Sequence, residues 1–299
     1  MVAQGKRRAG PSDPPSAGRC PASTIVIKSA AGMPSDIAAP VIRHDALGRD
    51  HFLLTLECPA IARAARAGQF VMLRTRPGFE PLLRRPMSIC RVLPGRRGRI
   101  QILYKVVGEG TRCLSQQPVG AIVPTLGPLG NGFRLPPAGT RPILVSGGIG
   151  IAIFPFLVEA LRAARRAAPL LIYGARAKGD LVALDFFRAR DVPMRLATED
   201  GSRGTKGLVT RLLEPLLARK DRAPHMEIFA CGPTPMLKAI GALGHRAGVP
   251  CQLALESQMP CGIGVCLGCV VACPPDERGP VFRRVCAEGP VFGADEVVL

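Results

Sequence analysis

The 299-residue sequence predicts a β-barrel followed by an α/β domain with a parallel sheet, and a cysteine-rich segment at the C-terminal end. Short apolar runs punctuated by Gly and Pro fill the first half. Longer-spaced apolar strands separated by helix-length segments fill the second half. Because a chain of this length is about twice a usual domain of roughly 150 residues, we expect two cores. The predicted limits are residues 1–22 for a basic tail, 23–136 for the barrel, 137–255 for the α/β domain and 256–299 for the last segment.

The composition excludes several classes of protein. Cysteine accounts for 11 of 299 residues, below the roughly 8–10% of a small disulfide scaffold. The longest apolar stretch, residues 143–158, is too short for a membrane span and is interrupted by glycine. The formal net charge of +18 favours anionic partners. The sequence has no Trp and two Tyr, however, and its Arg residues are scattered rather than gathered with aromatic residues, so we expect no nucleic-acid partner.

The expected elements follow from the apolar pattern. In the first half, short strands are expected at residues 25–27, 51–56, 70–73, 100–104 and 121–123, and five or six such strands make a small antiparallel barrel. In the second half, buried strands are expected at 143–145, 170–173, 194–197, 228–230 and 253–255, with a helix over about 151–167. Residues 1–22 lack apolar anchors and a secretory core, so a disordered tail on a cytoplasmic protein is expected.

The strongest chemical signal is a cysteine motif near the C-terminal end. The stretch Cys261-Gly-Ile-Gly-Val-Cys266-Leu-Gly-Cys269, followed later by Cys286, has the C-x-x-x-x-C-x-x-C…C spacing of plant-type [2Fe–2S] proteins. Four thiolates must converge on two irons, so the loop has to fold tightly around the inorganic core. The intervening glycines would allow that folding and let amide N–H groups point at the sulfurs. These glycines are Gly262, Gly264 and Gly268.

Two alternatives stay open for these cysteines. A structural zinc site would use the same thiols, although such sites usually pair two short C-x-x-C units. Cys273 could replace Cys286 as the fourth ligand, and Cys286 is preferred. Other cysteines are expected to be small buried or incidental side chains. They are Cys20, Cys58, Cys90, Cys113 and Cys251.

Three glycine-bearing strand ends predict a dinucleotide cleft. Gly147-Gly148-Ile149-Gly150 follows the first α/β strand and would let a pyrophosphate approach amides at a helix N-terminus, although the full G-x-G-x-x-G pattern is absent. The other two ends are Tyr173-Gly174-Ala175-Arg176 and Cys231-Gly232-Pro233. Ligands of open parallel sheets sit at the carboxyl ends of strands, so one shared cleft is expected. Glu199-Asp200 near another strand end disfavours a 2′-phosphate and favours NAD over NADP.

The first half carries weaker signals. Arg84-Arg85-Pro86-Met87-Ser88 combines a guanidinium, a rigid turn and a hydroxyl that can hold a phosphate. Leu103-Tyr104-Lys105 offers an aromatic ring to pack on a flat ligand, and Gly108-Glu109-Gly110-Thr111 is expected as a turn that presents amides and a hydroxyl. Each also has a simpler interpretation: a surface arginine pair, a strand tyrosine and a hairpin turn.

Together these motifs resemble, in order, the ferredoxin-reductase-like electron-transfer subunits of NAD-dependent dihydroorotate dehydrogenase B. The resemblance covers about residues 23 to 299 and includes Gly127-Pro128-Leu129-Gly130-Asn131. Most motifs belong to the wider flavin reductase superfamily. The position of the cysteine motif after Leu255-Glu256-Ser257-Gln258-Met259 narrows the resemblance to this family.

The resemblance implies three cofactor sites. FAD would contact Arg85, Pro86, Met87, Ser88, Leu103, Tyr104, Lys105, Gly110 and Thr111. NAD would contact Gly147, Gly148, Gly150, Gly174, Arg176, Asp200, Cys231, Gly232 and Pro233. A [2Fe–2S] cluster would be held by Cys261, Cys266, Cys269 and Cys286. No catalytic acid, base or nucleophile is nominated, because cofactors carry the chemistry, and the four histidines are interpreted as structural.

The resemblance also implies a partner. A separate FMN-containing catalytic subunit would oxidise dihydroorotate to orotate in pyrimidine (UMP) biosynthesis, in a heterotetramer of two catalytic and two electron-transfer chains. Electrons would pass from that FMN through the cluster and FAD to NAD⁺. One alternative is a related NAD(P)H:acceptor reductase subunit, of the sulfhydrogenase or ferredoxin–NADP transhydrogenase type. Some of those relatives have Asp in place of the first cluster cysteine, so Cys261 favours the dihydroorotate family. An alternative from a different functional class is a nucleic-acid-binding module stabilised by zinc bound to the cysteines.

Overall fold

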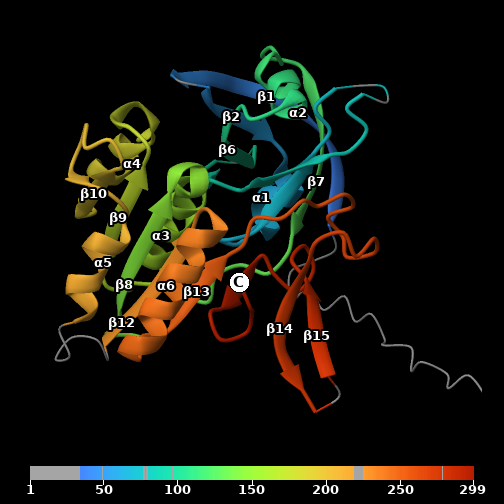
Figure 1. The fold of residues 1–299 in the computed structure, drawn as a ribbon. Coiled ribbons are helices and arrows are strands. Elements are labelled where there is room, and N and C mark those ends of the chain that lie inside the picture. The colour runs from blue at the N-terminus through green and yellow to red at the C-terminus, as the bar shows by residue number, and fades with distance from the viewer. Residues whose placement is uncertain are drawn as a thin grey trace, which may run out of the picture.

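The strands of the described part of the chain form two seven-stranded sheets and a two-stranded hairpin, and helices accompany the sheets. The computed structural model describes residues 34–48, 50–76, 78, 80–95, 97–218, 225–277 and 279–299. The predicted tail, the strand expected at 25–27 and Cys20 lie outside these residues. In Figure 1 the first sheet is blue to green, the second is green to orange except for its last strand, which is red, and the hairpin is also red.

The first sheet is antiparallel throughout and curls into a half-barrel. Its order is β4-β3-β7-β1-β2-β6-β5, with β4 and β5 as the two ends of the row. The strands are β1 (Ser35–Gly48), β2 (His51–Glu57), β3 (Phe70–Leu73), β4 (Arg85–Ser88), β5 (Arg91–Leu93), β6 (Arg99–Lys105) and β7 (Ile122–Leu129). Two short helices accompany it, α1 (Pro59–Ala64) and α2 (Glu109–Ser115). Four strands lie where the sequence predicts them, and their side chains form one apolar core.

Two motifs of this half adopt a different local structure from the predicted turns. Arg85–Ser88 is strand β4, paired with β3. Pro86 is tolerated there because β4 is an edge strand and one of its sides needs no N–H donor. Glu109-Gly110-Thr111 starts helix α2, where the Thr111 hydroxyl accepts hydrogen bonds from the N–H groups of Val107 (2.9 Å) and Gly108 (3.2 Å).

The second sheet is the predicted parallel sheet. Its order is β11-β10-β9-β8-β12-β13-β16, and all pairs are parallel except β13 with β16. All five expected strands are present, as β8 (Arg141–Gly147), β9 (Leu170–Ala175), β10 (Met194–Thr198), β12 (Met226–Cys231) and β13 (Cys251–Ala254). Two short strands, β11 (Thr205–Lys206) and β16 (Val291–Gly293), complete the sheet.

Helices cover both faces of this sheet, as alternating residues of β8 show. Ile143 and Val145 share a core with α5 (Thr210–Leu217) and α6 (Thr234–Ala247), whereas Leu144 shares another with α3 (Phe154–Ala163) and α4 (Leu184–Arg188). The expected helix over 151–167 divides into a 3₁₀ turn, η1 (Gly148–Ile153), and α3. A second 3₁₀ turn, η2 (Lys178–Asp180), follows β9.

The C-terminal segment is packed between the two sheets. Its hairpin consists of β14 (Val270–Asp276) and β15 (Gly279–Arg284), and its last strand, β16, joins the parallel sheet. One apolar core contains Met72 of the half-barrel, Leu253 of the parallel sheet and Cys286 of this segment. The predicted domain limits remain a prediction, although the chain passes from one sheet to the other between β7 and β8.

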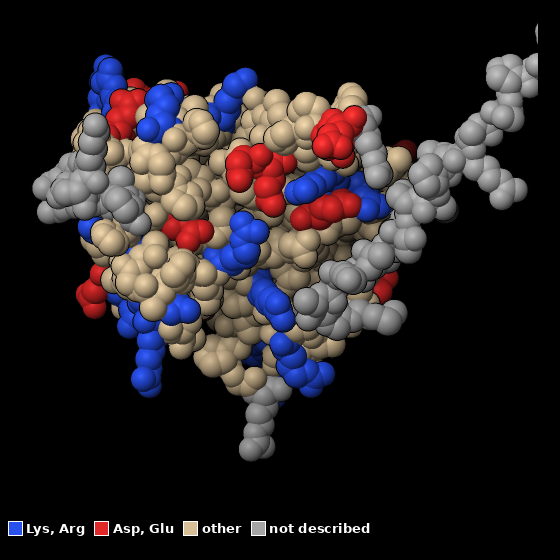
Figure 2. Space-filling view, turned by 90° about the horizontal axis from the view of Figure 1, so that it is seen from below, with Lys and Arg blue, Asp and Glu red and all other residues tan. Residues whose placement is uncertain are grey.

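The surface carries basic and acidic side chains side by side. On the face in Figure 2, Lys and Arg lie among Asp and Glu rather than in a single basic patch. None of the helices within the described ranges is both long and apolar enough to cross a membrane.

Candidate functional site

The parallel sheet has a crevice where its strand order reverses. From β8 the chain adds β9 and β10 on one side, and later β12 and β13 on the other. In such sheets ligands bind outside the carboxyl ends of the strands at this reversal. The end of β8, at Ser146, is paired with the end of β12, at Cys231, so two of the predicted glycine turns lie next to each other.

A cleft of about 630 Å³ opens at these strand ends. Predicted residues from all three turns line it: Gly147, Gly148, Gly174, Arg176 and Pro233. Glu199, noted in the sequence beside Asp200, also lines it, as do residues that sequence reasoning missed, including Asp180, Thr210, Met236 and Glu256. The cleft is in the size range of cofactor pockets.

Four residues predicted for this cleft are not among those that line it. Gly150 packs against the Cys231 carbonyl and the Gly232 amide, so it serves helix–strand packing. Cys231 is buried, and burial raises the pKa of its thiol. Asp200 instead accepts hydrogen bonds from the Ser202 amide (2.9 Å) and hydroxyl (2.6 Å), which lower its pKa. The acid that reaches the cleft is its neighbour Glu199.

A second cavity, of about 350 Å³, lies on the half-barrel. Eight of the nine residues predicted for a flavin line it: Arg85, Pro86, Met87, Ser88, Leu103, Tyr104, Lys105 and Thr111. The ninth, Gly110, lies directly against the Arg85 guanidinium, and a side chain there would collide with it. Strands β4 and β6 and the start of α2 therefore converge on this cavity.

Tyr104 also belongs to the core of the half-barrel. Its hydroxyl pairs with His44 Nε2 at 2.8 Å, and its ring stacks on Phe52 with centroids 5.6 Å apart. Burial raises the pKa of Tyr104. The other ring nitrogen of His44, Nδ1, lies 3.0 Å from the Gln117 carbonyl, so both ring nitrogens have partners in the half-barrel.

The two cavities adjoin. Lys105, Val107, Ile149 and Glu256 line both of them. The Glu256 side chain is exposed, yet the protein packed around its carboxyl raises its pKa through partial desolvation. The Lys105 ammonium forms an ion pair with Asp180 at 3.2 Å, which links the half-barrel to the parallel sheet at this junction. The sequence did contain a signal for Glu256, because this residue lies just beyond the carboxyl end of the last parallel strand, β13, where ligands of such sheets bind.

The cysteine motif forms a loop after β13 that packs on the half-barrel. Gly262 and Gly264 have positive φ angles of 73° and 84°, as the expected tight wrapping requires. A side chain at Gly262 would come within 2.5 Å of Met72 on β3. Cys261 is half-buried and Cys266 is exposed, whereas Cys269 and Cys286 are each only 2% exposed.

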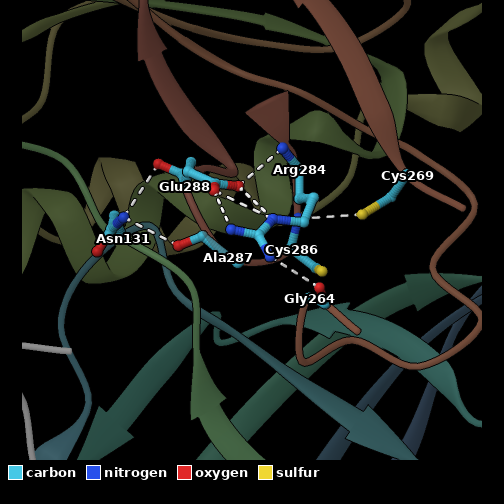
Figure 3. Close-up of polar contacts among 7 residues, drawn as sticks. All are labelled: Asn131, Gly264, Cys269, Arg284, Cys286, Ala287 and Glu288. Atoms are coloured by element: carbon cyan, nitrogen blue, oxygen red, sulfur yellow. Dashed lines mark hydrogen bonds and ion pairs between the residues drawn. The ribbon is translucent and has the colours of Figure 1, made fainter. Parts of the chain in front are cut away.

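The thiols lie in two interacting pairs. Burial opposes ionisation of Cys261, but hydrogen bonds from the amides of Ile263, Cys266 and Val265 and from the Cys266 thiol lower its pKa to about 6. Burial, followed by the neighbouring Cys269 and Cys261 thiols, raises the pKa of Cys286 to about 12. The Cys286 amide donates to the Cys269 sulfur at 3.4 Å (Figure 3). The predicted amide-to-sulfur contacts are therefore present.

Cys273 has different surroundings. It lies on β14, and its thiol contacts the Val271 carbonyl at 3.9 Å. Over the described ranges, no three His, Cys, Asp or Glu side chains are grouped to hold a single metal ion. Two cysteine pairs suit two irons, since a [2Fe–2S] centre takes four thiolates.

Solved structures share this architecture. The structure of an NADH-dependent reduced ferredoxin-NADP oxidoreductase, described for flavin-based electron bifurcation, is 28% identical, with a TM-score of 0.75 over 88% of this chain and 91% of that one. The ferredoxin reductase of carbazole 1,9a-dioxygenase is 24% identical, with a TM-score of 0.62 over 72% of this chain and 67% of that one. The fold is therefore ferredoxin-reductase-like.

The sequence relatives are more specific. Residues 256–298 match the family described as the iron-sulfur cluster binding domain of dihydroorotate dehydrogenase B. The dihydroorotate dehydrogenase B (NAD(+)) electron transfer subunit of Bacillus caldolyticus is 38% identical over 249 residues, which is 82% of this chain and 92% of that protein. The subunit of the same name from Desulforamulus reducens is 39% identical over 83% of this chain and 92% of that protein. This chain therefore belongs to the family of electron transfer subunits of NAD(+)-dependent dihydroorotate dehydrogenase B.

Proposed function

We propose that this chain conducts electrons, released when a partner subunit oxidises dihydroorotate, through a [2Fe–2S] cluster and FAD to NAD⁺. The observation that carries the proposal is the position of the half-barrel cavity. Met259 and Pro290, which flank the two cysteine segments, line that cavity on one side. Glu256 and Ile149 join it to the nucleotide cleft on the other. Three candidate sites are thus adjacent in the order that the reaction needs.

The half-barrel cavity suits FAD. Arg85 and Ser88 on β4 offer a guanidinium and a hydroxyl for the diphosphate, and Leu103 and Tyr104 on β6 offer apolar surface for the ring. The Thr111 hydroxyl accepts two backbone hydrogen bonds and orients the start of α2. These side chains bind and orient the flavin, and none acts as an acid or base in the proposal.

The cleft at the sheet reversal suits NAD. Gly147 and Gly148 allow a pyrophosphate to approach the backbone between β8 and η1. Glu199 lines the cleft and disfavours an added 2′-phosphate. Of the residues that we first assigned, Asp200, Cys231, Gly150 and Gly232 support the cleft from outside its lining. NAD as the acceptor agrees with the names of the relatives.

The cysteine loops suit a [2Fe–2S] cluster. We propose Cys261, Cys266, Cys269 and Cys286 as ligands, with Cys273 outside the set, because the Cys286 amide contacts the Cys269 sulfur whereas the Cys273 thiol contacts a carbonyl of its own strand. When bound, the cluster exchanges single electrons, NAD exchanges a hydride and FAD does both. The chain supplies position, burial and charge.

We propose that a catalytic subunit with FMN docks on the cysteine loop. Three apolar side chains of that loop are exposed: Ile263, Val265 and Leu267. Exposed apolar groups at such a site are typical of a protein interface. We further propose a heterotetramer of two catalytic and two electron-transfer chains in the cytoplasm, acting in pyrimidine (UMP) biosynthesis.

The test combines purified chains. The full chain is prepared anaerobically, its flavin, iron and sulfide are measured, and it is mixed with an FMN-containing dihydroorotate dehydrogenase catalytic subunit. Dihydroorotate-dependent reduction of NAD⁺ is expected for the pair and for neither chain alone. A pair replete in all cofactors that reduces no NAD⁺ would reject the proposal.

A matched variant tests the route. Cys266→Ser removes one exposed ligand and leaves the flavin cavity and nucleotide cleft intact. Oxidation of NADH by an artificial dye that takes electrons directly from FAD should persist. Dihydroorotate-dependent reduction of NAD⁺ should fall by about 10²-fold or more, because the cluster carries electrons from FMN to FAD. Equal loss of both activities would contradict a route through the cluster.

A further inference from the structure

An arginine between the two cysteine loops is held in a fixed position. Arg284 ends strand β15, two residues before Cys286, and its side chain is 19% exposed. Its Nε donates to the Glu288 carboxylate oxygens at 3.1 and 3.0 Å, and its Nη2 pairs with the same carboxylate. Glu288 also accepts the backbone amide of Arg284 at 2.7 Å. The guanidinium therefore has little freedom to move (Figure 3).

The remaining guanidinium arm reaches the other cysteine loop. Arg284 Nη1 donates to the Gly264 carbonyl at 2.9 Å. Gly264 lies between Cys261 and Cys266, and its amide donates toward the Cys286 sulfur. By holding the Gly264 carbonyl, Arg284 restrains the backbone next to this amide. The arginine thus connects the loop that carries three cysteines to the loop that carries the fourth.

The half-barrel supports the same connection. Asn131, just after β7, donates through Nδ2 to the carbonyls of Ala287 (3.2 Å) and Glu288 (3.0 Å). Its own backbone amide donates to the Gly289 carbonyl. Figure 3 shows Asn131 on one side of Glu288 and Arg284 on the other. The Cys286 loop is thereby held between the flavin-binding half and the arginine.

A positive charge lies beside the cysteines. The Arg284 guanidinium is close enough to both Cys269 and Cys286 to interact electrostatically with their sulfurs. Arginine stays protonated at all ordinary pH values. Arg284 therefore holds a permanent positive charge next to the cysteines, fixed in place by Glu288 and the Gly264 carbonyl.

We propose that Arg284, oriented by Glu288, is a positioning residue that raises the reduction potential of the [2Fe–2S] cluster, an inference that rests on the proposed function. A cluster with four thiolate ligands takes up one electron and no proton, so its net charge changes from −2 to −3. A nearby positive charge and an amide hydrogen bond to sulfur both favour the more negative form. Arg284 supplies the positive charge directly, and it supports the amide hydrogen bond through its contact with Gly264.

The test is a reductive titration of the isolated holoprotein with dithionite, followed by the cluster absorbance and the EPR signal of the reduced cluster. Arg284→Gln should make one-electron reduction about tenfold less favourable, a potential about 59 mV lower. Glu288→Gln should shift it in the opposite direction, because the guanidinium charge is then uncompensated. Arg284→Lys should fall between Arg284→Gln and the unchanged chain, since an ammonium keeps the charge but not the planar fork.

Arg283→Gln is the matched control. It removes the same charge from the adjacent position of β15, where the side chain is 42% exposed and pairs with Glu296 instead. Its cluster potential should equal that of the unchanged chain. The flavin potential, measured in the same titration, should not move in any variant.

The outcomes separate the two claims. An unchanged chain that binds no iron and sulfide would reject the proposed function itself. If the unchanged chain holds its cluster but Arg284→Gln and Glu288→Gln shift the potential in the same direction, or not at all, the role of Arg284 is overturned. If Arg284→Gln does not retain its cluster, the Arg284→Lys and Glu288→Gln variants still show in which direction the Arg284 charge shifts the reduction potential.

Discussion

The four cysteines proposed as ligands differ in their exposure. Cys269 and Cys286 lie in the core shared with the half-barrel, while Cys266 faces solvent and Cys261 is half-buried. One side of the cluster would therefore be covered by this chain, and the other would lie beside the apolar loop residues. We expect electrons to enter at the Cys266 side and to leave toward the flavin cavity.

At the residue scale, the first prediction concerns the fourth ligand. Cys286→Ser should lose most of its iron and sulfide, because one iron would lack a thiolate. Cys273→Ala should keep both at the level of the unchanged chain and lose only about 1 kcal/mol of stability for the small void that it leaves. Iron and sulfide per chain, with the visible spectrum, provide the measurement. The reverse pattern would make Cys273 the ligand.

The second prediction concerns Glu256, whose pKa is raised by removal from water. Since the folded chain binds this proton more tightly than the unfolded chain, stability should fall as pH rises from the ordinary glutamate pKa to the raised one. Glu256→Gln cannot bind this proton, so its free energy of unfolding should lack this contribution to the pH dependence. Denaturant midpoints between about pH 4 and about pH 8 give the measurement.

Asp200→Asn provides a control with the opposite sign. Hydrogen bonds from Ser202 lower the pKa of Asp200, so this carboxylate adds stability above its unfolded pKa and loses it as pH falls through the lowered one. An unaltered pH slope in Glu256→Gln would show that Glu256 titrates normally.

At the element scale, helix α3 joins the parallel sheet to the half-barrel. Glu159 on α3 pairs with Arg91 of β5 at 2.7 Å and with Arg190, after α4, at 3.0 Å. Both guanidinium groups lie over the Phe186 ring, 4.9 and 3.8 Å from its centroid. Two guanidinium groups thus share a single carboxylate and one aromatic ring, and this network connects α3 to the half-barrel strand β5.

The third prediction tests that network. Glu159→Gln should cost about 1 kcal/mol and lower the thermal midpoint by about 2–4 °C, because two partly buried guanidinium groups then lose their charged partner. Asp185→Asn, which breaks the exposed pair with Arg188, should change the midpoint by less than about 1 °C. Equal shifts in the two variants would show that the α3 network contributes no more than a surface ion pair.

The apolar pattern predicted the strands well where they are buried. The five parallel strands that the sequence predicts were located because residues such as Ile143 and Leu144 are apolar on both faces of the sheet, whereas the exposed two-residue strand β11 was missed. Strand β1 was missed because its residues are mostly half-exposed and include Pro40 and charged side chains. Strand β4 was predicted as a turn because Pro86 disfavours an interior strand, and only its place at the sheet edge permits it.

At the scale of the whole molecule, the segments that border the flavin cavity come from all parts of the chain. Arg85 comes from β4, Ile149 from the turn after β8, and Met259 and Pro290 from the C-terminal segment. Because β16 pairs with β13, that segment is anchored to the parallel sheet as well as to the half-barrel. A cluster there would have a fixed position relative to both cavities.

The fourth prediction concerns docking of the catalytic subunit. Leu267→Asp places a charge on the exposed cysteine loop and should weaken association at least about tenfold, because burying an unpaired carboxylate is costly. Val119→Asp, on an exposed site of the half-barrel away from that loop, is the control and should bind normally. Titration calorimetry of the holoproteins gives both affinities. Equal affinities would place the interface elsewhere.

The sequence by itself determined the chemistry, since cysteine spacing and glycine-bearing strand ends are local patterns set by covalent neighbours. It predicted the parallel sheet, an antiparallel barrel where the structure has a half-barrel, and eight of the residues that line the half-barrel cavity. Only the tertiary structure decided which acid reaches the nucleotide cleft, that Glu256 lies where the cavities meet, and that Arg284 connects two cysteine loops. Those facts depend on contacts between segments far apart in the chain, and local sequence patterns do not encode such contacts.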